Sequence, residues 1–168
     1  ELIAAIDEQL HELEAELSNI IDEDSEWADS IVRLQSIPGI GLITASLLVV
    51  LTLNFTTCPT AQAAASYAGL APHPRQSGNF HGRAQLGSHN NRRLRTALYM
   101  ASLSAARYNP VVKLFYDRLR AAGKPVKVAR CAAARKLLHV AWAVATKGQT
   151  FDPHHLVHST SPLLPDAC

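Results

Sequence analysis

The chain has 168 residues, of which 48% are hydrophobic, enough for one ordinary domain with a packed core. Its formal net charge of +2 hides a strong polarity along the chain. Residues 1–30 carry eleven acidic residues and no Lys or Arg, whereas residues 31–168 carry all sixteen Lys and Arg against three acidic residues, a net charge of +13. A body this basic is expected to bind a polyanion, and nucleic acid is the favoured partner.

Two classes of protein are disfavoured from the start. No secretory signal is visible, and the apolar run 40–53 is too short and too interrupted to cross a bilayer, so we expect no membrane partner. The three cysteines, Cys58, Cys131 and Cys168, have neither the number nor the spacing of a disulfide framework or a zinc site, and they fit a reducing, cytoplasmic compartment.

Because the chain begins at Glu1 inside an already regular pattern, we interpret it as a fragment.

Residues 2–23 are predicted to form a long, acidic, coiled-coil-like helix, the main part of a segment spanning 1–30. Apolar residues recur at alternating steps of three and four, the period of a coiled-coil seam; they are Ile3, Ile6, Leu10, Leu13, Leu17 and Ile20. The pattern favours pairing with another helix, and hence a homo-oligomer. An ordinary amphipathic helix lying on its own domain remains the alternative.

The rest of the chain is predicted to be helical, which makes the fold class all-α with a compact domain over 31–148 and a frayed tail over 149–168. Helical periodicity and capping residues place helices near 26–36, 42–53, 92–108, 110–121 and 126–146, and a further helix that opens at Thr57-Cys58-Pro59 and runs through 61–67 to Gly69. Four of the eight glycines and two prolines fall within 69–89. This long Gly/Pro-rich segment is predicted to be an irregular loop with room for a short hairpin, and its length points to function.

The turn Ile37-Pro-Gly39-Ile-Gly41 resembles a helix-hairpin-helix element. Its two glycines, Gly39 and Gly41, allow a tight turn, and the free N–H groups at the start of the next helix are suited to bind a DNA phosphate. A plain pair of antiparallel helices, with glycine required for steric reasons alone, is the alternative.

The loop contains a candidate nucleophile, Ser77, next to a glycine. A serine beside glycine is first of all a turn residue, but Arg75 and Arg83 flank this one and are suited to neutralise the transition state of a phosphoryl transfer. His73 and His81 are candidate bases, although histidines in loops are more often solvated. No Asp or Glu occurs between Ile31 and Tyr116, so we predict no metal site there.

Further basic residues lie on the helices that follow the loop. Arg92, Arg93 and Arg95 open a helix, where positive charge opposes the helix dipole and a bound phosphate would offset the cost. The residues Lys124, Lys127, Arg130, Arg135 and Lys136 fit contacts to a nucleic-acid backbone and simple solubility equally well. His154, His155 and His158 lack further ligands, so no metal site is predicted in the tail.

Several motifs follow one another in a characteristic order: Ser36-Ile-Pro-Gly-Ile-Gly41, Tyr67-Ala-Gly-Leu-Ala-Pro72, Gln76-Ser-Gly78, Gly82, Asn91-Arg-Arg-Leu-Arg-Thr-Ala-Leu-Tyr-Met100, Arg118-Leu-Arg-Ala-Ala-Gly-Lys-Pro-Val-Lys127 and Phe151-Asp-Pro153. This succession resembles the C-terminal half of insertion-sequence transposases of the IS110 (also IS116) family, and the resemblance covers nearly the whole chain. The acidic helix corresponds to the coiled-coil segment of that family.

The resemblance implies a DNA recombinase guided by a noncoding bridge RNA. In the family, a RuvC-like domain binds magnesium through four acidic residues, and a second domain supplies a serine nucleophile that forms a phosphoserine intermediate. The matching serine here is Ser77, whereas the four carboxylates have no counterpart in residues 1–168. Mg²⁺ would therefore be held by the RuvC-like domain and not by this fragment, which alone should bind DNA without recombining it.

The resemblance also places the protein in the bacterial or archaeal cytoplasm, associated with the nucleoid. Two other functions remain as alternatives. One is a non-catalytic helix-hairpin-helix module that binds DNA, in which Ser77 is only a turn residue. The other is an oligomerisation domain driven by residues 2–23.

Overall fold

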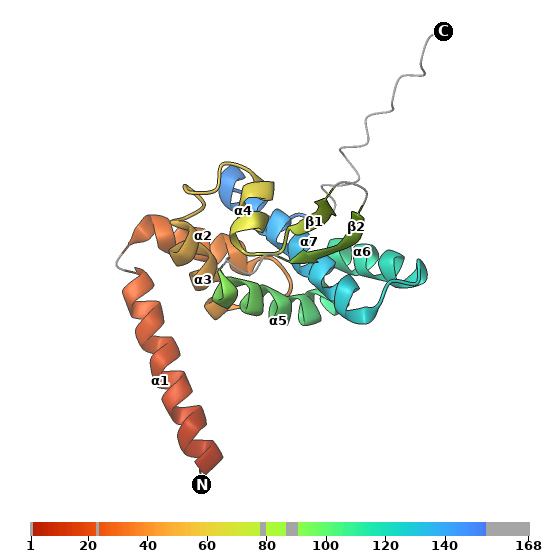
Figure 1. Ribbon diagram of the computed structural model, residues 1–168. Coiled ribbons are helices and arrows are strands. Elements are labelled where there is room, and N and C mark those ends of the chain that lie inside the picture. The colour runs from red at the N-terminus through yellow and green to blue at the C-terminus, as the bar shows by residue number, and fades with distance from the viewer. Residues whose placement is uncertain (1, 23, 78–79, 87–90, 154–168) are drawn as a thin grey trace.

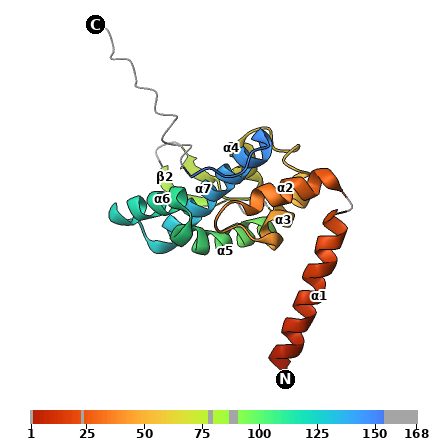
Figure 2. The ribbon, with the colours of Figure 1, turned by 180° about the vertical axis from the view of Figure 1, so that it is seen from behind.

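The computed structural model describes residues 2–22, 24–77, 80–86 and 91–153, with the backbone alone considered for 73–77 and 80–86. The prediction of an all-α fold is confirmed: seven helices make up this part of the chain, joined by one short hairpin of strands (Figures 1 and 2). In chain order the elements are α1 (Leu2–Asp22), α2 (Ser25–Gln35), α3 (Leu42–Thr52), α4 (Ala61–Tyr67), β1 (Pro72–Ser77), β2 (Phe80–Leu86), α5 (Arg92–Tyr108), α6 (Pro110–Ala121) and α7 (Val126–Lys147).

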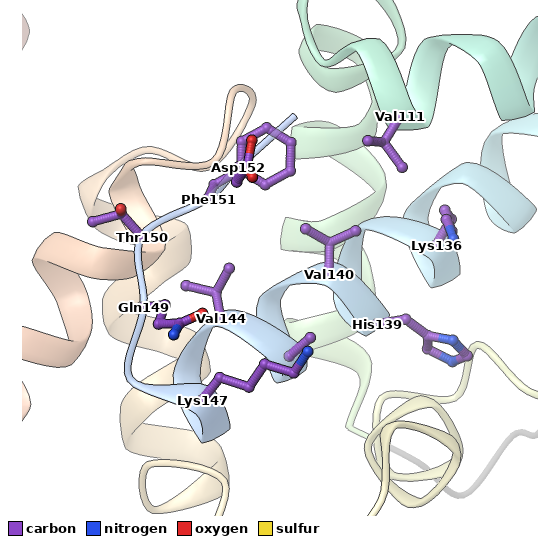
Figure 3. A pocket seen from close by; sticks show the side chains of 11 residues that line it. Val111, Lys136, His139, Val140, Val144, Lys147, Gln149, Thr150, Phe151 and Asp152 are labelled. Carbon is purple, nitrogen blue, oxygen red and sulfur yellow. The ribbon is translucent and has the colours of Figure 1, made fainter. Parts of the chain in front are cut away.

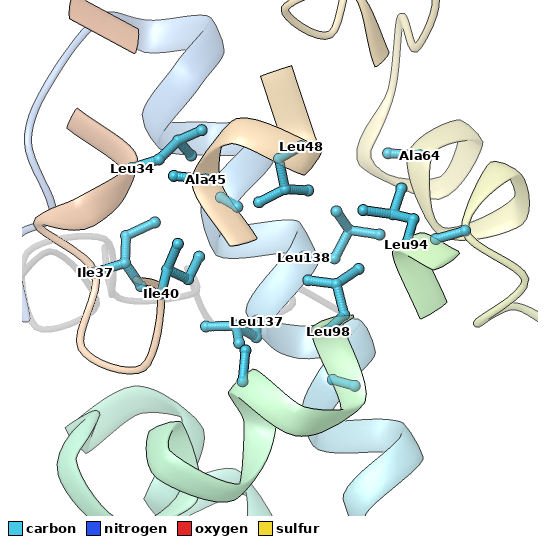
Figure 4. Packing of buried hydrophobic residues seen from close by; sticks show 14 of the residues in the cluster. Leu34, Ile37, Ile40, Ala45, Leu48, Ala64, Leu94, Leu98, Leu137 and Leu138 are labelled. Atoms are coloured by element: carbon cyan, nitrogen blue, oxygen red, sulfur yellow. The ribbon is translucent and has the colours of Figure 1, made fainter. Parts of the chain in front are cut away.

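The helix α7 is the centre of the body, and α2, α4, α5 and α6 all pack against it. Four of its alanines are fully buried, and their small side chains let the neighbouring helices approach closely. Leu137 and Leu138 project from α7 between Leu48 of α3 and Leu98 of α5, so one continuous core joins the two sides of the molecule (Figure 4). This core fixes the positions of all the loops.

The helix α1 stands apart from the core. It extends away from the body in both views, and its contacts with other helices are mainly with α2 (Figures 1 and 2). Most of its apolar seam is exposed, with Ile6 at 47%, Leu10 at 51% and Leu13 at 61%, while Ile21 reaches the core. Asp24 then caps α2, so the division drawn at residue 30 from the sequence falls inside α2.

The Gly/Pro-rich segment contains a two-stranded antiparallel hairpin. Pro72 is opposite Leu86, Gln76 opposite His81 and Ser77 opposite Phe80, with an irregularity between His73 and Arg75. β1 is polar and contains two prolines, so it shows no strand signal, whereas β2 alternates apolar or small residues with polar ones over 80–86. The prediction of an irregular loop missed this alternation. In the described residues the two strands pair only with each other.

No helix in the described part of the chain is long and apolar enough to cross a membrane.

Candidate nucleic-acid interface

The hairpin brings the residues predicted around the serine onto two adjacent strands. Ser77 is the last residue of β1, Arg75 lies on the same strand, and Arg83 follows Gly82, the residue opposite Arg75 on β2. Of the two candidate bases, His81 lies next to Phe80, the residue opposite Ser77, whereas His73 lies at the other end of the hairpin.

Asn91 bridges the two ends of the segment that contains the hairpin. Its backbone N–H donates to the carbonyl of Tyr67 at 3.0 Å, and its side-chain amide donates to the Tyr67 hydroxyl at 3.4 Å. Asn91 Oδ1 also accepts from the backbone N–H of Leu94 at 3.0 Å, which caps α5. One residue thus joins the end of α4 to the start of α5 and closes the segment that carries Ser77.

The predicted arginine cluster follows directly from this cap. Arg92 and Arg93 are exposed in the first turn of α5, and Arg95 is half-buried one turn further on. Because Asn91 caps α5 and is bonded to Tyr67, the three arginines begin next to the residue that closes the segment 67–91. No Asp or Glu occurs in the sequence between residues 31 and 116.

The two glycines of the predicted helix-hairpin-helix turn have different surroundings. Gly39 has a φ of +103°, and a Cβ built there would lie 2.6 Å from Ala105 Cβ and 2.8 Å from the backbone of that residue. Gly41 has ordinary extended backbone, is exposed, and has nothing within 4 Å of its Cβ position. Gly39 is therefore required for packing against α5, and Gly41 remains the candidate for phosphate binding.

Gly41 also begins α3 without a side-chain cap, so backbone N–H groups at that end are not satisfied by a capping side chain. On the inner side of the same turn, Asn109 Nδ2 donates to the carbonyl of Pro38 at 3.4 Å. The turn is thus fixed from within by α5 and α6 and exposed at Gly41.

An apolar cavity of about 220 Å³ lies along the second half of α7 (Figure 3). Val140, Val144 and Phe151 line it, together with His139 and other residues. The segment 149–152, which was predicted to be part of a frayed tail, forms one wall of this cavity. It is held there by a hydrogen bond from the backbone N–H of Phe151 to Ser36 Oγ at 2.8 Å. Burial lowers the pKa of His139, and the positive charges of Arg135 and Lys136 lower it further.

A second groove, of about 320 Å³, lies between the root of the hairpin and the first half of α7, and sequence reasoning did not find it. We call it the hairpin groove; it is lined by Leu70, Pro72, Lys127, Val128, Cys131, Ala132 and Arg135. Burial raises the pKa of the Cys131 thiol, and the nearby charge of Arg95 opposes that rise. Lys127, Cys131 and Arg135 are four residues apart, so the sequence could have placed them on one face of a helix. No local pattern predicts that Pro72 lies opposite this face.

No group of three or more potential metal ligands occurs in the described residues. His154, His155 and His158, considered as ligands from the sequence, lie outside the described residues. The donor set of this body does not suit Mg²⁺, which prefers carboxylate oxygens.

A helical body with a basic surface and a polar hairpin carrying a serine is typical of a nucleic-acid-binding protein. The family model described as "Transposase IS116/IS110/IS902 family" matches residues 32–117, which includes the turn, the hairpin and α5. The chain belongs to this transposase family, as its motifs predicted.

Relatives of known name agree with this assignment. The "Insertion element IS110 uncharacterized 43.6 kDa protein" of Streptomyces coelicolor is 35% identical over 152 residues, covering 89% of this chain and 36% of the relative. The "Pilin gene-inverting protein" of Moraxella lacunata is 38% identical over 122 residues, covering 71% of this chain and 38% of the relative. The "Transposase for insertion sequence element IS1328" of Yersinia enterocolitica is 30% identical over 147 residues, covering 86% and 43%. The chain thus spans less than half the length of these relatives.

Proposed function

We propose that this chain is the serine-bearing half of a DNA transposase or recombinase, with Ser77 as its nucleophile. The observation that carries the proposal is the position of Ser77 at the end of β1, in a segment whose two ends, Tyr67 and Asn91, are bonded together at the start of an arginine-rich helix. The names of the relatives, a transposase and a pilin gene-inverting protein, support DNA rearrangement as the general activity.

In the proposed reaction, Ser77 Oγ attacks the phosphorus of a DNA phosphodiester. The Ser77 hydroxyl loses its proton, a new O–P bond forms, and the bond to the leaving DNA oxygen breaks, so that the leaving strand ends in a hydroxyl after taking up a proton. A hydroxyl of the recipient strand then attacks the phosphoserine and releases Ser77. Arg75 and Arg83 would stabilise the negative charge that develops on the phosphoryl oxygens.

The chain is proposed to act with a segment outside residues 1–168 that supplies the carboxylates and the magnesium, since the described residues offer no suitable ligand cluster. A noncoding bridge RNA would select the DNA sites, and α1 would join copies of the protein through its exposed seam. Residues 1–168 alone are expected to bind DNA without exchanging strands.

The test combines the chain with the missing nuclease half, magnesium, bridge RNA and cognate DNA, and looks for a covalent protein–DNA adduct on a denaturing gel. The adduct should form with the wild type and be lost in Ser77→Ala. Ser88→Ala is the matched control, because Ser88 is the only other serine between residues 69 and 89. Loss of the adduct in Ser88→Ala but not in Ser77→Ala would show that Ser88, and not Ser77, is the nucleophile.

The alternative function, a non-catalytic helix-hairpin-helix module that binds DNA, is favoured by the exposed, uncapped start of α3 at Gly41. Gly41→Val tests it, because the added side chain enters open space and leaves the fold intact. Weaker DNA binding by Gly41→Val, with DNA binding but no adduct in both the wild type and Ser77→Ala, would support this alternative. Substituting Gly39 as well would only disturb the packing on Ala105.

A further inference from the structure

The hairpin groove is a basic site whose cations have few carboxylates near them. Lys127 and Arg135 line it, and Arg95 lies near enough to influence the Cys131 thiol. Only three acidic residues follow residue 30. Of these, Asp117 pairs with Lys113, Asp152 lines the other cavity, and Asp166 lies outside the described residues.

The guanidinium of Arg135 has a donor that the protein leaves unsatisfied. Arg135 Nε is buried and has no hydrogen-bond partner. Arg33 also has a buried Nε without a partner, but its Nη2 donates to Ser30 Oγ at 3.1 Å. A buried donor without a partner costs free energy, about 1–3 kcal/mol, and an anion bound in the groove would remove this cost.

The size and the walls of the groove limit what it can hold. A volume of about 320 Å³ is at the lower end of the range for small-ligand sites, roughly 300–1,000 Å³, so it suits one or two units of a single strand and not a duplex. Leu70, Pro72 and Val128 give it an apolar wall, against which a sugar can pack while the cations hold the phosphate.

The position of the groove relates it to Ser77. Pro72 is the first residue of β1 and Ser77 the last, so at about 3.3 Å per residue the serine lies roughly 16 Å from the groove along the strand. Stacked nucleotides advance about 3.4 Å each, which makes this separation about five nucleotides.

We infer that the hairpin groove binds the phosphodiester backbone of the DNA strand that Ser77 attacks, at a phosphate several nucleotides from the scissile one, with Arg135 and Lys127 as its ligands. This inference rests on the proposed function and adds the path of the strand to it. Arg135 is a positioning residue: it holds the strand and takes no part in bond formation.

The first experiment measures the salt dependence of binding of a mixed-sequence single-stranded DNA oligonucleotide to the chain, for wild type, Arg135→Gln and Lys136→Gln. Arg135→Gln should weaken binding and lower the slope of log K against log salt by about one, because one phosphate contact is lost. Lys136→Gln is the matched control: it removes the same charge from the next residue of α7, which lines the other cavity. Equal slopes for the two variants would overturn the inference.

The second experiment needs no change in the groove and decides the matter if Arg135→Gln does not fold. In a Cys168→Ser chain, Cys131 is the thiol open to alkylation, because Cys58 is buried. Single-stranded DNA should protect Cys131 from alkylation. DNA that binds without protecting Cys131 would overturn the groove assignment and leave Ser77 untouched. A wild-type chain that binds no DNA would overturn both proposals.

Discussion

Gly39 and Gly41, the two glycines between α2 and α3, have different surroundings, so substitutions at the two positions should change the stability of the chain differently. At Gly39 a methyl group would meet Ala105 at 2.6 Å, and the φ of +103° disfavours any side chain. Because α5 cannot move without disturbing the core, Gly39→Ala should reduce the free energy of unfolding by about 2 kcal/mol or more. Urea denaturation of the purified chain measures this.

Gly41→Ser is the control for that measurement. Its side chain enters open space at the first residue before α3, and a serine there can cap the helix. Its stability should equal or slightly exceed that of the wild type. Two glycines that behaved alike would contradict the packing described for Gly39.

The sequence alone could assign neither role. Both glycines fit a helix-hairpin-helix turn, and both were predicted to bind phosphate. What distinguishes them is a contact with Ala105, a residue far along the chain on another helix, and no local pattern predicts which alanine of α5 approaches the turn. The turn itself was predictable because glycine and proline define it locally.

His139 should make the stability of the chain depend on pH. Burial, with the charges of Arg135 and Lys136, holds its pKa in the folded state below the ordinary value of 6.5. The folded chain therefore favours the neutral ring, and this contribution is fully present above pH 6.5 and is lost as the pH falls below it. Thermal melting from pH 7 downwards should show a steeper loss of stability for the wild type than for His139→Gln.

His11→Gln is the matched control, because His11 is an exposed histidine on α1. It should keep the pH dependence of the wild type. If His139→Gln kept it too, the His139 ring would not be the group that titrates.

The helices other than α4 were predictable to within one or two residues, and their ends explain why; α4 was predicted to open at Thr57-Cys58-Pro59 and begins at Ala61. Asn91 and Asn109 cap α5 and α6 with their side chains, and Pro110 begins α6 where its missing N–H costs nothing. These signals are local. β2 alternates apolar or small residues with polar ones, a local signal for a strand, whereas β1 is polar, contains two prolines and lacks any such signal. The same applies to Leu53, Asn54 and Phe55, three successive left-handed residues after α3 that no glycine announces.

Asn109 connects two elements and should be sensitive to small changes. It is fully buried, its Oδ1 accepts from the backbone N–H groups of Val111 and Val112, and its Nδ2 donates to the carbonyl of Pro38. Asn109→Ala loses the cap and leaves buried polar groups unpaired, so it should cost about 2 kcal/mol of stability by urea denaturation.

Asn109→Asp separates the two contributions. An aspartate can still cap α6, but it cannot donate to Pro38 and would place a carboxylate against that carbonyl oxygen. It should therefore destabilise the chain as well. An Asp variant as stable as the wild type would show that the bond to Pro38 contributes nothing.

The exposed seam of α1 predicts self-association. Leu10 is 51% exposed on α1, so Leu10→Glu should leave the melting temperature of the body unchanged. Burying a leucine contributes about 1.5–3 kcal/mol, so its loss from the seam of paired helices should weaken association about tenfold or more. Sedimentation velocity measures this, with Gln9→Glu as the control that adds the same charge outside the seam. A wild-type chain that stays monomeric at high concentration would contradict the seam's role.

At the scale of the whole molecule, the chain separates an acidic helix from a basic body. Residues 1–30 carry eleven acidic residues, and those that the structure describes lie on α1, at the cap of α2 and in its first half, while the hairpin, α5 and α7 carry positive charge. Figure 1 shows α1 extending away from the elements that carry the hairpin. With 21 residues at 1.5 Å each, α1 is about 30 Å long, so much of its charge is held far from the proposed DNA-binding surface.

Because α1 is held away from the body, the effect of its acidic residues on DNA binding should depend on ionic strength. The Debye length is about 8 Å at 0.15 M salt and about 30 Å at 0.01 M, so α1 should repel DNA only at low salt. Glu8, Glu12 and Glu16 are exposed, and changing all three to Gln should tighten DNA binding at about 0.01 M salt while leaving it unchanged at about 0.15 M. Titration of labelled DNA at both salt concentrations measures the two dissociation constants. An effect that persisted at the higher salt would mean that bound DNA lies within a few ångströms of α1, contrary to the surface proposed around the hairpin and α7.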